Sequence, residues 1–176
     1  MMLSRATVFP SDVKTLRTRV ARVVREGLAR SPKRLPSWLF YDDAGSALYE
    51  QITALPEYYL TRAEAEIFRM HGDTIAWVAG EGSRISLAEL GAGSATKTEI
   101  LLRAVIARQL SCTYLACDIS SSVLHELEAR MAERFSSIDV KTAVCTHEEA
   151  VPLIASLPDR QALLFIGSSI GNFDDH

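Results

Sequence analysis

After Gly80, short apolar runs alternate with stretches whose apolar residues recur every three to four positions. The runs have the length of buried strands, and the intervening stretches have the length of helices. This alternation is typical of βαβ units, in which helical crossovers connect parallel strands. We therefore predict a doubly wound α/β sheet. The expected strands are residues 85–90, 114–117, 140–145 and 163–166, and the expected helices are residues 95–109, 121–135 and 148–156.

The first 80 residues lack this alternation and predict helices instead. A peripheral, half-buried helix ends at Ser31-Pro32, and its apolar face consists of Leu16, Val20, Val23, Val24 and Leu28. An aromatic loop follows over residues 35–43, and a second helical stretch over residues 46–55 closes at Pro56. This region resembles a lid or cap.

A third helix is expected from Thr61 to Gly80. Thr61 and Glu64 have the spacing of a capping box. The expected apolar face consists of Ile67, Phe68, Ile75 and Val78. The sequence thus predicts two parts, an all-helical cap or lid region over residues 1–80 and an α/β domain over residues 81–176.

Composition restricts the classes of function. The chain is 48% hydrophobic and 23% charged, which predicts a folded soluble domain, and the net charge of -3 argues against nucleic acid as a partner. No apolar run is long enough to span a membrane, and we expect a cytoplasmic protein that takes a small-molecule substrate. The arginine-rich segment 13–30 could be a transit peptide, but Asp12 and Glu26 favour a structural helix. The three cysteines and four histidines lack metal-ligand spacing, so no metal is expected and the cysteines are interpreted as packing residues.

The sharpest local motif is Glu89-Leu90-Gly91-Ala92-Gly93-Ser94, which follows the first expected strand of the α/β part. Glycine lets the backbone turn tightly there and lets a ligand lie against it, beyond the strand ends of an open α/β sheet. A cofactor site is implied, although such a pair can also merely close a strand-to-helix turn. Asp118 ends the next strand, where an acid can accept hydrogen bonds from ribose hydroxyls or can act as the N-cap of the following helix.

The kind of cofactor follows less directly. A dinucleotide fingerprint needs glycine or alanine at position 96, where the chain has Thr96, which weakens the NAD interpretation. Glu89 could lie near a donor ammonium, and Lys97 could meet a donor carboxylate at the N-terminus of a helix or could be a solvated surface lysine. An acid two residues before the first glycine belongs to the pattern of S-adenosylmethionine methyltransferases, which is a resemblance.

Three blocks extend this resemblance along almost the whole chain. The first runs from residues 38–46, which include the segment Tyr41-Asp42-Asp43-Ala44-Gly45-Ser46, into residues 51–64. The second covers residues 89–98, and the third covers residues 167–172. Together they resemble the histidine Nα-methyltransferases of ergothioneine biosynthesis, whereas a generic methyltransferase shares only the second block. The resemblance implies a Rossmann-like class I methyltransferase sheet, S-adenosyl-L-methionine as methyl donor, and the α-amine of L-histidine as acceptor.

The resemblance also assigns residues. It makes Gly91, Lys97 and Asp118 donor contacts, and it makes Tyr58 and Asn172 contacts to the amino-acid substrate. Without it, Asn172 could be a turn residue after Gly171, and Tyr58 could pack as a lid aromatic, as could the adjacent Tyr59. No residue is assigned as a catalytic base.

Two departures from the family pattern affect these expectations. An Asp-Phe pair usually contacts the adenine, but the corresponding place is occupied by Thr146 and His147. Family members also continue well beyond Asn172, so we expect an incomplete sheet of about four parallel strands, an exposed apolar edge at residues 163–166, and negligible activity of this chain alone, as for a fragment or truncated product. Two rival functions stay open, a family member that acts on another amine or amino acid and a non-catalytic donor-binding remnant.

Overall fold

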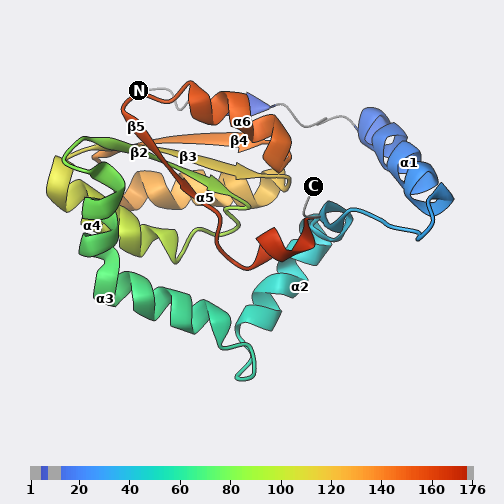
Figure 1. Ribbon diagram of the computed structural model, residues 1–176, viewed down its shortest axis with the longest axis horizontal. Coiled ribbons are helices and arrows are strands. Elements are labelled where there is room, and N and C mark those ends of the chain that lie inside the picture. The colour runs from blue at the N-terminus through green and yellow to red at the C-terminus, as the bar shows by residue number, and fades with distance from the viewer. Residues whose placement is uncertain (1–4, 8–12, 174–176) are drawn as a thin grey trace.

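The computed structural model describes residues 5–7 and 13–173, and its centre is one parallel sheet (Figure 1). The strands are β1 (Arg5–Thr7), β2 (Ile85–Leu90), β3 (Cys112–Asp118), β4 (Ile138–Val144) and β5 (Arg160–Leu164). They lie in the order β1-β4-β3-β2-β5, and every neighbouring pair is parallel. From β2 the chain adds β3 and β4 on one side and then places β5 on the other side. The strand order therefore reverses between β2 and β5, which is where an open α/β sheet binds ligands. The predicted α/β fold is confirmed.

Helices cover both faces of the sheet (Figure 1). The helices are α1 (Val13–Ala29), α2 (Asp43–Thr53), α3 (Leu60–Gly80), α4 (Thr98–Gln109), α5 (Ser121–Arg134) and α6 (His147–Ala155), with the 3-10 turns η1 (Ser37–Phe40) and η2 (Ser169–Asn172). The larger core cluster joins α4 and α5 to one face of the sheet, and a smaller cluster joins α6 to the other. Each residue of β2 is buried, because β2 has a strand on both sides and helices above and below.

The sheet differs from the prediction at its two edges. Arg5–Thr7 pairs with β4, so the first 80 residues are not all helical. The last strand runs from Arg160 to Leu164, whereas residues 163–166 were expected. It therefore begins three residues earlier and ends two residues earlier than predicted. Its register with β2 determines these bounds, since Ile85 pairs with Arg160 and Glu89 pairs with Leu164. Polar residues are tolerated there because β5 is an edge strand, and the side chain of Leu163 is 51% exposed, as the expectation of an exposed apolar edge requires.

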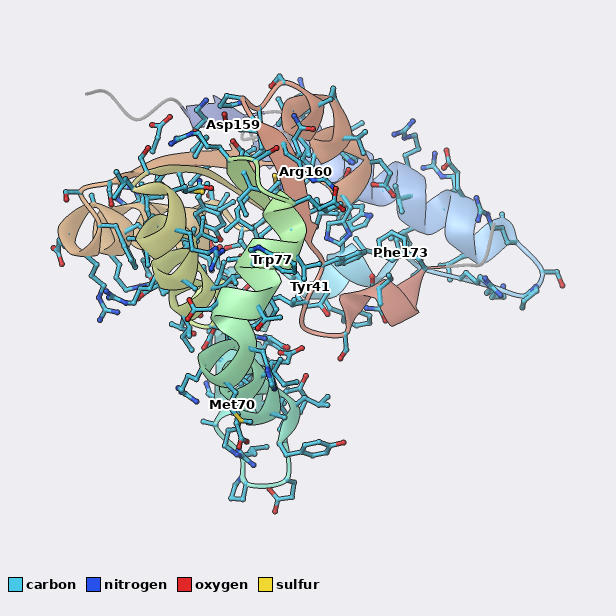
Figure 2. All side chains as sticks on the ribbon, turned by 60° about the vertical axis from the view of Figure 1, so that its left-hand side comes forward. Tyr41, Met70, Trp77, Asp159, Arg160 and Phe173 are labelled. Carbon is cyan, nitrogen blue, oxygen red and sulfur yellow. The ribbon has the colours of Figure 1, made fainter. Side chains whose placement is uncertain are left out.

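Helix α3 packs along α4 mainly through small residues, and only part of its predicted apolar face is buried. Its buried positions are Ala65, Phe68, Gly72, Ala76 and Gly80, spaced by three or four residues. Of the four residues expected to face inward, Phe68 and Ile75 pack against the interior, whereas Ile67 and Val78 are exposed. The small residues let α4 approach closely, so the larger ones, with Met70 and Trp77, are left outside (Figure 2).

The prediction that Thr61 and Glu64 form a capping box at the start of α3 is wrong. The helix begins at Leu60 with Tyr59 as N-cap, and no side chain caps it. The side chain of Glu64 is engaged elsewhere, by Lys97 and by the backbone of Gly167. A capping box exists instead at α6, where Thr146 and Glu149 cap each other's backbone N–H groups.

The start of α2 requires particular residues at positions 42, 43 and 45. The Asp42 side chain caps α2 by accepting a hydrogen bond from Gly45 N at 2.8 Å. A Cβ on Gly45 would lie 1.7 Å from the carbonyl oxygen of Phe40, so only glycine fits. Asp43 Oδ1 accepts hydrogen bonds from the hydroxyls of Ser120 and Ser122, which connects the start of α2 to the start of α5.

Candidate functional site

The glycine turn after β2 lies directly against the end of β3. Gly91 and Gly93 have φ values of 68° and 51°, a left-handed conformation that glycine adopts without strain. The N–H groups of Gly91 and Ala92 donate to Cys117 O at 2.9 and 3.0 Å. Gly93 N donates to Asp118 Oδ2 at 2.9 Å. The turn is therefore held by the neighbouring strand, and the glycines serve its conformation, as predicted.

Asp118 braces this turn and is not the N-cap of α5. Ser120 caps that helix by accepting from Val123 N, while Asp118 Oδ1 accepts from Ser120 N at 3.0 Å. Burial raises the pKa of the Asp118 carboxyl above its usual range, and the hydrogen bonds from Ser120 and Gly93 act in the opposite direction. Each carboxylate oxygen can accept more than one hydrogen bond, so Asp118 retains acceptor capacity toward the cavity beside it.

A cavity of about 720 Å³ lies at the carboxyl ends of the strands and joins three of the five predicted site residues. Gly91 and Asp118 line it from the ends of β2 and β3, and Asn172 lines it from η2, past the end of β5. Tyr41 and Phe173 line it from segments far apart in the sequence (Figure 2). The cavity thus spans the place where the sheet reverses, as expected for an α/β cofactor site.

Tyr58 does not line this cavity. Its hydroxyl lies 3.3 Å from that of Tyr49, and the two rings pack edge to face with centroids 6.2 Å apart. Tyr49 lines the cavity, so Tyr58 contacts a residue of the cavity wall. Burial raises the pKa of the Tyr49 hydroxyl, so it stays protonated and can donate a hydrogen bond. The sequence indicated an aromatic lid here but carried no signal that selects Tyr49.

Lys97 occupies the N-cap position of α4 and is paired rather than free. Its ammonium forms a salt bridge with Glu64 of α3, and the two side chains are 18% and 25% exposed. Glu64 also accepts a hydrogen bond from Gly167 N at 3.1 Å. Lys97 lies four residues past Gly93 but is not among the residues that line the cavity.

Glu89, interpreted from the sequence as an acid that could lie near a donor ammonium, is not among the residues that line the cavity. Its side chain is buried, and its two oxygens accept hydrogen bonds from Tyr114 at 2.6 Å and from Thr98 at 2.9 Å. Burial raises its pKa to about 7, partly offset by these two bonds. Glu89 therefore links β2, β3 and the start of α4 beneath the turn.

The segment after β4, where the family pattern is absent, has both structural and cavity-lining roles. Thr146 caps α6 as described above. The His147 ring lines the cavity and packs on Phe165 and Phe173, with centroids 5.0 and 5.3 Å apart. Burial lowers the pKa of His147, which favours the neutral imidazole. Sequence reasoning overlooked these three rings as a group because they are brought together only by the fold.

The cysteines, a metal site and a membrane span were also considered from the sequence. Cys112, Cys117 and Cys145 are free and buried in the two core clusters, which confirms that they pack. Over residues 5–7 and 13–173, no group of three or more His, Cys, Asp or Glu side chains is arranged to hold a metal ion. In the same part of the chain, no helix has both the length and the apolarity of a membrane span.

The strand order, the glycine turn and the carboxylate at the adjacent strand end define a Rossmann-like α/β domain, a class of fold in which nucleoside cofactors bind beyond such strand ends. More specifically, the chain belongs to the family of histidine-specific, S-adenosylmethionine-dependent methyltransferases, whose family model matches residues 20–176. The resemblance inferred from the sequence is thereby confirmed.

Curated relatives agree with this family. The chain is 37% identical to a histidine N-alpha-methyltransferase of Mycolicibacterium smegmatis over 172 residues, 98% of this chain and 52% of that protein. It is 39% identical to one of Mycobacterium tuberculosis over 86% of this chain and 46% of that protein. A 4-dimethylallyltryptophan N-methyltransferase of Claviceps fusiformis is 31% identical over 85% of this chain and 43% of that protein. The chain spans about half the length of the relatives it matches.

Proposed function

We propose that this chain binds S-adenosyl-L-methionine and contributes the donor half of an enzyme that methylates the α-amine of L-histidine. The observation that carries the proposal is the shared cavity, in which Gly91, Asp118 and Asn172 meet where the sheet reverses. Gly91 leaves the backbone bare for close approach, and Asp118 offers carboxylate oxygens to ribose hydroxyls. These residues fit a nucleoside cofactor with an amino-acid tail.

The donor, when bound, supplies a methyl group activated by a sulfonium. The residues of this chain bind and orient the two reactants. In this proposal Lys97 binds the donor carboxylate, and Asn172 and Tyr58 bind the polar groups of the amino-acid substrate. Asn172 lines the cavity, whereas Lys97 and Tyr58 lie outside its lining, Lys97 on Glu64 and Tyr58 on Tyr49, so both side chains must turn toward it to make these contacts. Methyl transfer of this kind is an in-line displacement that needs an unprotonated amine and good alignment more than a covalent intermediate.

Histidine as acceptor, and the step toward trimethylhistidine in ergothioneine biosynthesis, are supported by the family match and by the M. smegmatis and M. tuberculosis relatives. The C. fusiformis relative supports a second candidate, because it is named for a different amine, 4-dimethylallyltryptophan. The third candidate is a donor-binding module without catalysis of its own.

Calorimetry with S-adenosylhomocysteine tests the donor proposal directly. We expect saturable binding with one site per chain, and no binding of NAD under the same conditions, because Thr96 stands where a dinucleotide site needs a smaller residue. Tight binding of NAD in place of S-adenosylhomocysteine would replace the methyl donor by a nicotinamide cofactor. Binding of neither would refute a cofactor site in this cavity.

A further inference from the structure

One carboxylate, that of Glu64, contacts both sides of the proposed site. It projects from the first turns of α3, outside the cavity. One oxygen accepts from the ammonium of Lys97, at the start of α4, and the other accepts from Gly167 N at 3.1 Å. Lys97 follows the glycine turn, and Gly167 begins the segment that leads through η2 to Asn172.

The segment that Glu64 holds is conformationally demanding. Gly167 has a φ of 81°, and the next residue, Ser168, has a φ of 65°. Two consecutive residues in the left-handed region need outside support to persist, since Ser168 is not a glycine. The hydrogen bond to Glu64 supplies support at the first of them, and a Cβ on Gly167 would lie 3.8 Å from the Tyr49 hydroxyl. Glu64 therefore supports the backbone at Gly167, which lies next to Tyr49 and begins the segment that ends at Asn172.

We propose that Glu64 is a positioning residue that couples the two halves of the site. It holds the side chain of Lys97 in place at the start of α4 and fixes the segment 167–172 that presents Asn172 to the amino-acid substrate. The inference rests on the proposed function, because it takes Lys97 to be a donor contact. It adds a residue that contacts neither reactant and acts through two others.

Two physical arguments favour positioning over a mere connection between helices. Helices α3 and α4 already pack through Ala65, Phe68, Gly72 and Ala76, so the ion pair is not needed to dock them. A lysine has a long flexible side chain, and ordering it on ligand binding costs conformational entropy that a pre-formed partner removes beforehand. The negative charge of Glu64 does not oppose the donor as a whole, because the donor's amino-acid end carries an ammonium beside its carboxylate.

A double-mutant cycle with Lys97 tests this coupling by calorimetry of S-adenosylhomocysteine. We expect Glu64→Gln to weaken binding about five- to tenfold, since Lys97 loses a charged partner. In the Lys97→Met background, Glu64→Gln should cause no further loss, because its effect passes through Lys97. Glu66→Gln is the matched control, an exposed glutamate two residues away on the same helix, and it should leave affinity unchanged.

The second oxygen is tested separately by amide hydrogen exchange at Gly167. A glutamine at position 64 still has a carbonyl oxygen that accepts from Gly167 N, so Glu64→Gln should keep this amide protected, whereas Glu64→Ala should lose protection. Thermal melts identify variants that do not fold. If Glu64→Gln fails to fold, Glu64→Asp replaces it, because the shorter side chain withdraws from both partners and should weaken binding and protection together.

The outcomes separate this inference from the proposed function. If Lys97→Met alone leaves affinity unchanged, Lys97 is not a donor contact, and both the donor role of Lys97 and the coupling are overturned. If Lys97→Met weakens binding but Glu64→Gln does not, or weakens it equally in both backgrounds, the donor role stands and the positioning role of Glu64 is refuted. Loss of affinity in Glu66→Gln as large as in Glu64→Gln would also refute it, since the effect would then be one of general charge.

Discussion

The donor half and the substrate half of the proposed site are built from different parts of the molecule. The glycine turn and Asp118 follow β2 and β3, neighbouring strands in the interior of the sheet. Tyr58 lies between α2 and α3, and Asn172 lies past β5, an edge strand whose Leu163 is exposed. The donor half is therefore determined by the core, whereas the substrate half depends on a few polar contacts between peripheral segments.

The largest expected effect concerns turnover, which requires both halves. We expect this chain to show negligible methylation of histidine, even where it binds S-adenosylhomocysteine. Well-aligned reactants owe roughly 7 to 11 kcal/mol of barrier reduction to positioning. Residues 1–176 span about half the length of the M. smegmatis relative, so we expect them alone to align the two reactants poorly. Incubation with histidine and labelled donor measures the turnover. The comparison is a chimaera that appends the remaining sequence of the M. smegmatis relative, and equal turnover by both proteins would remove the contrast between the halves.

The second prediction concerns the buried Glu89 beneath the donor turn. Its pKa is about 7 in the folded protein against 4.5 for an ordinary glutamate, so folding favours the protonated form. Its contribution to stability is fully present below pH 4.5 and is lost as the pH rises through about 7, a change of roughly 3 kcal/mol. Glu89→Gln cannot titrate, so the fall in unfolding free energy between pH 5 and pH 8 should shrink.

Urea denaturation at the two pH values measures this change. Glu66→Gln is the control, because that glutamate is exposed and its removal should leave the pH dependence as it is. An unchanged pH dependence in Glu89→Gln would show that the titration of Glu89 does not contribute to the unfolding free energy.

The third prediction compares the two halves by ligand affinity. Asp118→Ala should weaken S-adenosylhomocysteine binding by about 1 to 3 kcal/mol through lost charge-assisted hydrogen bonds. Asn172→Ala should change that affinity by less than about 0.5 kcal/mol, since Asn172 is assigned to the amino-acid substrate. Calorimetry on both variants, with far-UV circular dichroism to verify folding, makes the test. Equal losses would mean that the cavity does not divide as proposed.

The smallest effect distinguishes two glycines. Gly91→Ala places a side chain at a φ of 68°, which should cost about 1 to 2 kcal/mol of stability. Gly171→Ala in η2 should be close to neutral, because a Cβ there meets nothing within 4 Å and the backbone φ is not positive. Chemical denaturation compares them. A larger loss of stability in Gly171→Ala than in Gly91→Ala would contradict this prediction.

The sequence predicted best what depends on local pattern and on the core. The strand at 85–90 is confirmed residue for residue, because β2 is mostly apolar, buried throughout and followed by glycine. The start of β5 could not be predicted, since pairing with β2 rather than apolarity determines it. Glu64 was interpreted as a cap because Thr61 has the right spacing, but its partners are 33 and 103 residues away. No periodicity signals contacts of that range.

The edge position of β5 bears on how proteins of this kind diverge. Among the residues that the structure describes, only one side of β5 is paired, so additional structure can join there without disturbing β2 and β3. The segment that carries Asn172 follows this same strand, so changes in the surrounding structure should first alter the side of the site that we propose to bind the acceptor. The M. smegmatis and C. fusiformis relatives are both named as N-methyltransferases, one for histidine and one for 4-dimethylallyltryptophan, so the named acceptor differs among proteins similar to this chain.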